Sequence, residues 1–190
     1  MPGTNTANDS GKIGEKEFKD KLESRNLSDK YNDKRNIHID GFHLKPDNHT
    51  FWTDIQGNEV HIDFESRWQI GSGTAFEKNS KYTEHVIAGL RKFVVVLTND
   101  DNLWADSFIK LRNLNPNIPV MVVFQSHWDE LLDKIEDARE RRLTLEQFSE
   151  IILKYRQLFS TPNPIIVKQK KLQEAIKKQQ KKLEEAIKKQ

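Results

Sequence analysis

Four charged side chains between positions 47 and 67 have residue types and a spacing that suit phosphate chemistry. Asp47 follows Pro46, and three more charged residues alternate along a later segment: Asp63, Glu65 and Arg67. Carboxylate oxygens are the ligands that Mg²⁺ prefers, and a guanidinium group can contact two phosphate oxygens at once. The group therefore fits the binding of a hard divalent cation against a phosphate.

A β-hairpin is the element that would position these side chains. Residues 50–55 and 59–68 are rich in aromatic and β-branched residues, and Gln56-Gly57-Asn58 between them is a turn signal. Alternation in the second run predicts apolar side chains in the core and polar ones on the opposite face: Val60, Ile62 and Phe64 against His61, Asp63, Glu65 and Arg67. If the two runs pair around the turn, Asp47 returns to the neighbourhood of Glu65 and Arg67. The alternative is a half-buried strand whose charged face is simply solvated.

This segment resembles the PD-(D/E)XK nuclease superfamily, and most of all its type II restriction endonucleases. Pro46-Asp47 matches the first half of the motif, and Glu65-Ser66-Arg67 matches the second half with Arg in place of Lys. Residues 68–78 are similar to the loop and helix start that follow the motif in some of these enzymes. The resemblance implies an α/β fold, a mixed β-sheet flanked by helices that forms a restriction endonuclease-like core. It also implies a Mg²⁺-dependent endonuclease that cleaves double-stranded DNA as a homodimer.

Within that resemblance, Asp47 and Glu65 are the expected Mg²⁺ ligands, with Asp63 as a further candidate. Arg67, where the family has Lys, is expected to stabilise negative charge in the transition state. An arginine contacts phosphate oxygens well but does not act as a base. Three interpretations stay open: charge stabilisation suffices, another residue activates the water, or the chain is an inactive nuclease-fold DNA-binding protein. A second register is also open, in which Asp63 and Glu65 form the catalytic pair and Glu65 stands in the Lys position.

Several other residues are weaker candidates. Glu15 lies on the first expected helix, where the family often places a Glu near the metal, and a solvent-facing helix charge is the alternative. Gly71-Ser72-Gly73 lacks the Lys and the strand context of a P-loop, so we interpret it as the turn from the active strand into the next helix. Four side chains around that turn are candidate DNA contacts: Gln69, Ser72, Thr74 and Lys78.

The expected order of elements is a helix, then strands, then alternating helices and strands. We expect helices over 11–26, 76–92, 102–113 and two more after Ser126 and Thr144, and strands over 36–44, 50–55, 59–68, 93–98 and 118–124. From the first helix, Ile13, Phe18 and Leu22 are expected to face inward. The last two strands with a helix between them form a βαβ unit, which implies parallel pairing. The expected division is a disordered leader over 1–10, an endonuclease-like domain over 11–160, a linker over 161–167 and a Lys-rich helical tail over 168–190.

The tail contains an internal repeat. KLQEAIKKQ at 171–179 recurs as KLEEAIKKQ at 182–190, eleven residues later. The repeat makes a narrow apolar stripe on a helix, formed by Leu172, Ile176, Leu183 and Ile187. Three interpretations stay open: an oligomerisation helix, which would make the chain a coiled-coil interaction protein, an arm that contacts the DNA backbone, or a solvated helix.

Composition limits the remaining classes. The chain has 190 residues, 32% of them charged, and no Cys, which excludes disulfides, zinc–thiolate sites and thiol catalysis. His38, His43 and His61 could meet across neighbouring strands, but no HxH or HxxxH pattern supports a zinc site. The tail over 168–190 carries nine Lys and three Glu, a net +6 that leaves the rest of the chain at −4. No apolar run approaches the roughly 18 residues of a membrane span and no signal peptide is visible, so we expect a cytoplasmic protein.

Overall fold

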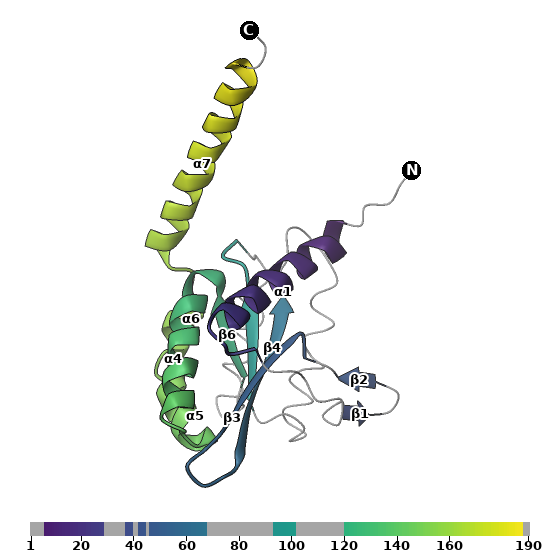
Figure 1. Ribbon diagram of the computed structural model, residues 1–190, viewed down its shortest axis with the longest axis vertical. Coiled ribbons are helices and arrows are strands. Elements are labelled where there is room, and N and C mark those ends of the chain that lie inside the picture. Colours follow the sequence, from purple (N-terminus) through teal and green to yellow (C-terminus); the bar gives the residue numbers. More distant parts are fainter. Residues whose placement is uncertain are drawn as a thin grey trace.

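The computed structural model describes residues 6–28, 37–39, 42–44, 46–67, 93–101 and 120–187, and the side chains of 12–28, 46–66, 93–101 and 120–185. Its elements in chain order are α1 (Thr6–Ser24), β1 (Ile37–Ile39), β2 (Phe42–Leu44), β3 (Asn48–Thr53), β4 (Glu59–Arg67), β5 (Val94–Thr98), β6 (Val120–Phe124), η2 (Gln125–His127), α4 (Trp128–Glu140), α5 (Leu145–Leu153), α6 (Arg156–Phe159) and α7 (Pro164–Ile187). Figure 1 shows a sheet with helices packed along it and α7 projecting away from the body.

The central sheet has the strand order β3-β4-β5-β6. β3 and β4 are antiparallel, whereas β4, β5 and β6 run parallel to one another. The predicted α/β class, with a mixed sheet flanked by helices, is therefore confirmed, and so is the parallel pairing of the two apolar strands. The helices expected over 76–92 and 102–113 lie outside the described residues.

The prediction of a single strand over 36–44 is wrong. The segment instead forms two short strands, β1 and β2, which pair antiparallel with His38 opposite His43. The dipeptide Asp40-Gly41 stands between them in the sequence, and Asp-Gly is a hairpin signal that outweighs the β-propensity of the flanking residues.

The turn between β3 and β4 is built around Asp54. Its carboxylate accepts hydrogen bonds from the backbone N–H groups of Gln56 at 2.8 Å and Asn58 at 2.9 Å. Burial raises the pKa of Asp54, but the hydrogen bonds from Asn58, Gln56 and Gly57 outweigh it and lower the pKa overall. Gly57 has a φ of +87°, which a glycine adopts without strain. The predicted hairpin and its turn are thus confirmed.

The tip of this hairpin is tied to the loop between α4 and α5. Arg142 donates to the carbonyl oxygens of Thr53 at 3.2 Å and Asp54 at 2.7 Å, and the indole N–H of Trp52 donates to the carbonyl of Leu143 at 2.7 Å. These contacts anchor β3 to a segment almost ninety residues away along the chain.

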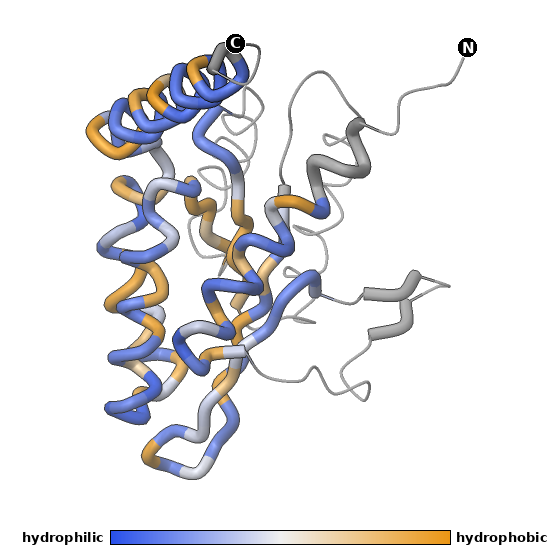
Figure 2. The backbone as a smooth tube through the Cα atoms, turned by 45° about the horizontal axis from the view of Figure 1, so that its top comes forward, coloured by the Kyte–Doolittle hydropathy of each residue, from blue (hydrophilic) through white to orange (hydrophobic). Residues whose placement is uncertain are grey.

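The main core lies on one face of the sheet. Val60, Ile62 and Phe64 are at most 2% exposed, as the alternation in β4 predicts. The ring of Phe18 on α1 lies 4.8 Å from that of Phe64 and 5.1 Å from that of Trp128 on α4. Figure 2 shows apolar segments of α1, α4 and the strands meeting in this layer. α1 and α4 therefore close the core over β4.

Two details of α1 differ from expectation. The helix begins at Thr6, inside the segment expected as a disordered leader. Phe18 and Leu22 are buried as predicted, but Ile13 is 57% exposed. Figure 1 shows that the N-terminal half of α1 runs out past the described strands of the sheet, so none of the described strands packs against it there.

Two residues, Ser126 and Thr144, stand before expected helices, and only Thr144 caps its helix. Thr144 and Gln147 form the capping box that begins α5, which confirms the predicted start. Ser126 does not cap α4, because it lies inside η2. Its N–H donates to the Asp100 carboxylate at 3.0 Å and its hydroxyl oxygen accepts from the N–H of Asn163 at 2.8 Å, so it connects the sheet to the base of α7 instead.

α7 starts earlier than the tail expected over 168–190. The Asn163 side chain accepts from the N–H of Ile165 at 3.1 Å and of Ile166 at 3.4 Å, and Pro164 occupies the first helical position. Asn before a helix and Pro at its first position are favoured residues there. Four of the seven residues of the expected linker over 161–167 are therefore helical. Among the described residues, no helix is both long and apolar enough to cross a membrane.

Candidate functional site

The candidate residues lie at one edge of the sheet. β4 runs parallel to β5, with Glu65 opposite Val96 and Arg67 opposite Thr98, so Glu65 and Arg67 lie near the carboxyl ends of parallel strands. β3 runs the other way, so its start reaches the same edge and brings Asp47 there. In open α/β sheets, ligands bind outside the carboxyl ends of the parallel strands. We call this region, formed by the start of β3 and the carboxyl ends of β4, β5 and β6, the carboxyl edge.

Asp47 is held against the second half of the motif. Its Oδ2 accepts a hydrogen bond of 2.7 Å from the backbone N–H of Ser66, the residue between Glu65 and Arg67. The hairpin register explains this placement, because Asn48 pairs with Phe64 and Asp47 comes one residue earlier. The expected approach of Asp47 to Glu65 and Arg67 is thus confirmed for the backbone of that segment.

The two carboxylates of β4 are buried. Asp63 is 7% exposed and Glu65 is 1% exposed, and both lie on the face opposite the main core. Val94, Val96 and Val122 form a small apolar cluster on that same face. Carboxylates buried to this degree are rare unless they are paired or bind a cation. The alternative of a simply solvated charged face is therefore wrong for these two residues.

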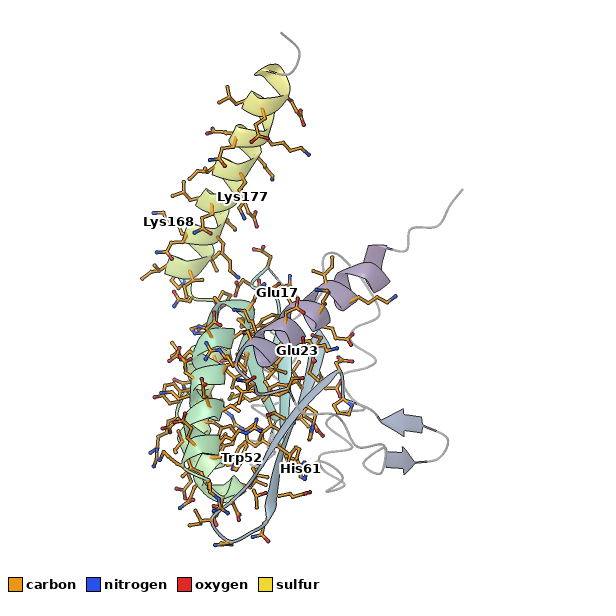
Figure 3. The ribbon with its side chains drawn as sticks, viewed as in Figure 1. Glu17, Glu23, Trp52, His61, Lys168 and Lys177 are labelled. Carbon is orange, nitrogen blue, oxygen red and sulfur yellow. The ribbon has the colours of Figure 1, made fainter. Side chains whose placement is uncertain are left out.

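A histidine that the sequence reasoning missed lies beside Asp63. His49 is opposite Asp63 in the hairpin register, with 3.9 Å between its Nε2 and Asp63 Oδ1. The same Nε2 lies 3.1 Å from Nδ1 of His61, and the two rings stack with 5.3 Å between their centroids. His61 Nε2 in turn lies 2.9 Å from the Glu59 carboxylate. A chain of polar side chains therefore runs along this face from Asp63 toward the hairpin turn, and Figure 3 labels one of them, His61 on β4.

The three histidines considered from the sequence are placed only in part, because the side chains of His38 and His43 lie outside the described side chains. His38 and His43 are partners in the β1–β2 pair, whereas His61 contacts His49. The signal that could have found His49 was the turn at 56–58, because a hairpin centred there fixes which residue faces Asp63.

α1 reaches the carboxyl edge from the core side. The backbone carbonyl of Glu15 accepts a 3.3 Å hydrogen bond from the side chain of Asn48, which follows Asp47. Glu15 is half-buried, so its helix position is at the site rather than out in solvent. Two residues further along α1, the Glu17 carboxylate accepts from Gln125 Nε2 at 2.8 and 2.9 Å, just after the end of β6. Figure 3 shows Glu17 at this edge, close to the base of α7.

Some candidate residues are not placed. The backbone of Arg67 belongs to β4, but its side chain lies outside the described side chains, and the DNA-contact candidates Gln69, Ser72, Thr74 and Lys78 lie outside the described residues. Within the described side chains, no three His, Asp or Glu residues are arranged to hold a metal ion. Mg²⁺ in phosphoryl-transfer sites is held by one or two carboxylates together with substrate phosphates, so the oxygen donors of Asp47 and Glu65 fit its chemistry.

Comparisons of the chain with protein-family models, with curated proteins and with solved structures found no match. The resemblance to PD-(D/E)XK nucleases therefore rests on the motif residues and stays a prediction.

Proposed function

We propose that this chain is a Mg²⁺-dependent DNA endonuclease of the sequence-specific type II class. The observation that carries the proposal is the hydrogen bond from Ser66 N–H to the Asp47 carboxylate, which joins the two halves of the motif at the carboxyl edge. The burial of Glu65 beside that contact supports it, because a buried carboxylate at a ligand-binding edge is suited to a cation.

In this proposal, Asp47 and Glu65 hold the metal, and Asp63 is a further ligand candidate two residues before Glu65 on the same face. Bound Mg²⁺ would supply a more acidic water and draw charge from the scissile phosphate. The chain's own contribution is to fix the two carboxylates: the Ser66 N–H orients Asp47, and the β4–β5 pairing fixes Glu65. Arg67, at the end of β4, would contact the phosphate oxygens as negative charge develops on them.

Double-stranded DNA is the proposed substrate, and a homodimer is the proposed assembly. One such site cuts one strand, so two copies related by a twofold axis would cut both strands of a palindromic sequence. This part of the proposal rests on analogy with the resembled family.

A second candidate function is DNA binding without cleavage. The observation in its favour is Arg67, because an arginine in the position of the usual Lys does not accept a proton.

Incubation of supercoiled plasmid with the protein and Mg²⁺, followed by sequencing of the ends, tests both functions. The enzyme predicts discrete ends, which disappear in Glu65→Gln. Glu23→Gln serves as the matched control, because it makes the same chemical change at an exposed position on α1. Intact plasmid with a shifted mobility would favour the binding protein, and intact, unshifted plasmid would refute both.

A further inference from the structure

Most lysines of α7 lie on one side of the helix, and Glu174 lies among them. Six of them form two rows along it: Lys170, Lys177 and Lys181, and Lys171, Lys178 and Lys182. Steps of seven and eleven residues return to within roughly 20° of the same direction in a helix of 3.6 residues per turn. We call this set the lysine face. Leu172, Ile176 and Leu183 lie on the opposite side of the helix.

The base of the lysine face is fixed at the carboxyl edge. Lys170 Nζ lies 3.8 Å from the Asp100 carboxylate, and Lys171 Nζ lies 3.6 Å from that of Asp101. Asp100 and Asp101 follow β5, so the side of α7 that carries the lysines is the side toward that edge. The later lysines share this direction, and they continue it outward along the projecting helix seen in Figure 3, where Lys177 is labelled.

Hydrogen bonds fix the start of α7 to the rest of the protein. Ser126 accepts from the N–H of Asn163 at 2.8 Å, and the same residue is bonded to Asp100. The ring of His127 lies 3.0 Å from the carbonyl oxygen of Thr161. The direction of α7 is thus set by contacts at its first turn and by the residues just before it.

The outer part of the lysine face carries a net positive charge, because its four lysines outnumber Glu174 and Glu185 on the same side of the helix. Lys177, Lys178, Lys181 and Lys182 are exposed, and no ion pair with another described residue involves them. α7 as a whole has seven Lys and three Glu over its 24 residues, whereas the chain outside 168–190 has a net charge of −4. The positive charge of this protein is therefore concentrated on one projecting helix.

We propose that the lysine face of α7 binds the phosphate backbone of double-stranded DNA. From Lys170 to Lys182 the face is roughly 18 Å long, at about 1.5 Å per residue. Duplex DNA carries one negative charge per about 1.7 Å of its axis, so roughly ten phosphates lie along that length. The choice of DNA as the polyanion rests on the proposed function, while the placement and charge of the face do not.

The apolar stripe on the other side of α7 does not compete with this role. Leu172 and Leu183 are 63% and 64% exposed. Because the stripe lies opposite the lysine face, a second copy packed on it leaves the lysines open to DNA. An anionic membrane surface is the competing partner, because a basic amphipathic helix also suits such a surface.

Salt dependence of binding tests the inference directly. The variant replaces Lys177, Lys178, Lys181 and Lys182 together by Gln, which keeps the helix because Gln is a good helix former. The control replaces the same four by Arg, which keeps the charge. Binding of each full-length protein to a fluorescent 30-bp duplex is measured by anisotropy in Ca²⁺ between about 50 and 200 mM salt.

The expected result is a shallower dependence of log K on log [salt] in the Gln variant and an unchanged slope in the Arg control. Each lost phosphate contact reduces the magnitude of the slope by about 0.9, so the loss of the four lysines should reduce it by about 2 to 4. An unchanged slope in the Gln variant, with its helix intact by circular dichroism, overturns the inference. So does a Gln variant that loses binding to phosphatidylserine vesicles while its DNA slope is unchanged.

The outcome is separable from that of the proposed function. If the plasmid stays intact but the slope falls in the Gln variant, the lysine face binds DNA and the endonuclease proposal fails. If the plasmid is cut and the slope does not change, the endonuclease proposal stands and the lysine face has no part in DNA binding.

Discussion

Replacing Asp47 by Asn separates the structural role of this residue from its proposed role as a metal ligand. The Asp47 carboxylate accepts a 2.7 Å hydrogen bond from the N–H of Ser66, a residue only 9% exposed. Asn offers a carbonyl oxygen of the same shape at the same position, so the hydrogen bond is kept. Ala removes the acceptor altogether. Both substitutions remove the negative charge that would bind Mg²⁺.

The two effects differ in size. Leaving a buried N–H without an acceptor costs about 1–3 kcal/mol, so Asp47→Ala should lower the free energy of unfolding by that amount. For a chain of this length, each kcal/mol corresponds to a Tm shift of roughly 2–4 °C. Asp47→Asn should lose about 1 kcal/mol, the difference between a hydrogen bond to a charged and to a neutral acceptor. Both variants should lose cleavage by at least about 100-fold, because a bound metal supplies several kcal/mol of charge stabilisation.

Urea unfolding and single-turnover plasmid cleavage at several Mg²⁺ concentrations measure the two quantities. Asp47→Asn should shift half-maximal cleavage to higher Mg²⁺ as well as slowing it. Asp20→Asn, at an exposed position on α1, is the control for the loss of one carboxylate. Cleavage by Asp47→Asn within tenfold of the wild type would refute the ligand role. Equal destabilisation by Asn and Ala would refute the role of the hydrogen bond.

Three other predictions concern the registers, the core and the turn. If Arg67 stabilises transition-state charge, Arg67→Lys keeps single-turnover cleavage and Arg67→Ala lowers it by about 10²–10³-fold; if Asp63 and Glu65 are the catalytic pair, Asp63→Asn abolishes cleavage and Arg67→Ala has a small effect. Trp52→Phe removes the buried hydrogen bond to the Leu143 carbonyl and should reduce the urea-unfolding free energy by about 1–3 kcal/mol, and a loss near zero would contradict the importance of that bond. Burial raises the pKa of Asp54, but the hydrogen bonds from Asn58 and Gln56 outweigh it and lower the pKa below its ordinary 3.8. The stability that this carboxylate contributes is therefore complete above about pH 4 and is lost as the pH falls through the lowered pKa. Asp54→Asn should flatten the decline in unfolding free energy between about pH 5 and about pH 2, and an unchanged decline would contradict the assignment.

Local patterns predicted a large part of the fold. The alternation of Val60, Ile62 and Phe64 identified the buried face of β4, because side chains of a strand alternate between its two faces. Thr144 marked a helix start, and the structure shows its side chain accepting from the backbone N–H of Gln147 in a capping box. These signals act between neighbouring residues, so one sequence contains all of the information that they need.

The predictions that failed depend on contacts between segments that are far apart in the sequence. Ser126 has the residue type of a helix cap, but its hydroxyl accepts from Asn163, which the local sequence does not indicate. Ile13 fits the apolar pattern of α1, yet that turn of the helix extends past the sheet. The partnership of His49 with Asp63 required the hairpin register, which only the position of the turn determines.

The anchoring of the β3–β4 hairpin by Arg142 and Leu143 bears on when the protein can fold during its synthesis. β3 and β4 are complete once residue 67 has been made, but the residues that hold the hairpin tip come about 75 positions later. Ribosomes add roughly 5–20 residues per second, so this interval lasts roughly 4–15 s. Trp128, which covers Phe18, is also made within that interval. α1 is made before β4 and already supplies Phe18 against Phe64, but the contacts from α4 and from Arg142 and Leu143 are missing on the nascent chain for several seconds, so completion of the core has to wait for the segment that follows β6.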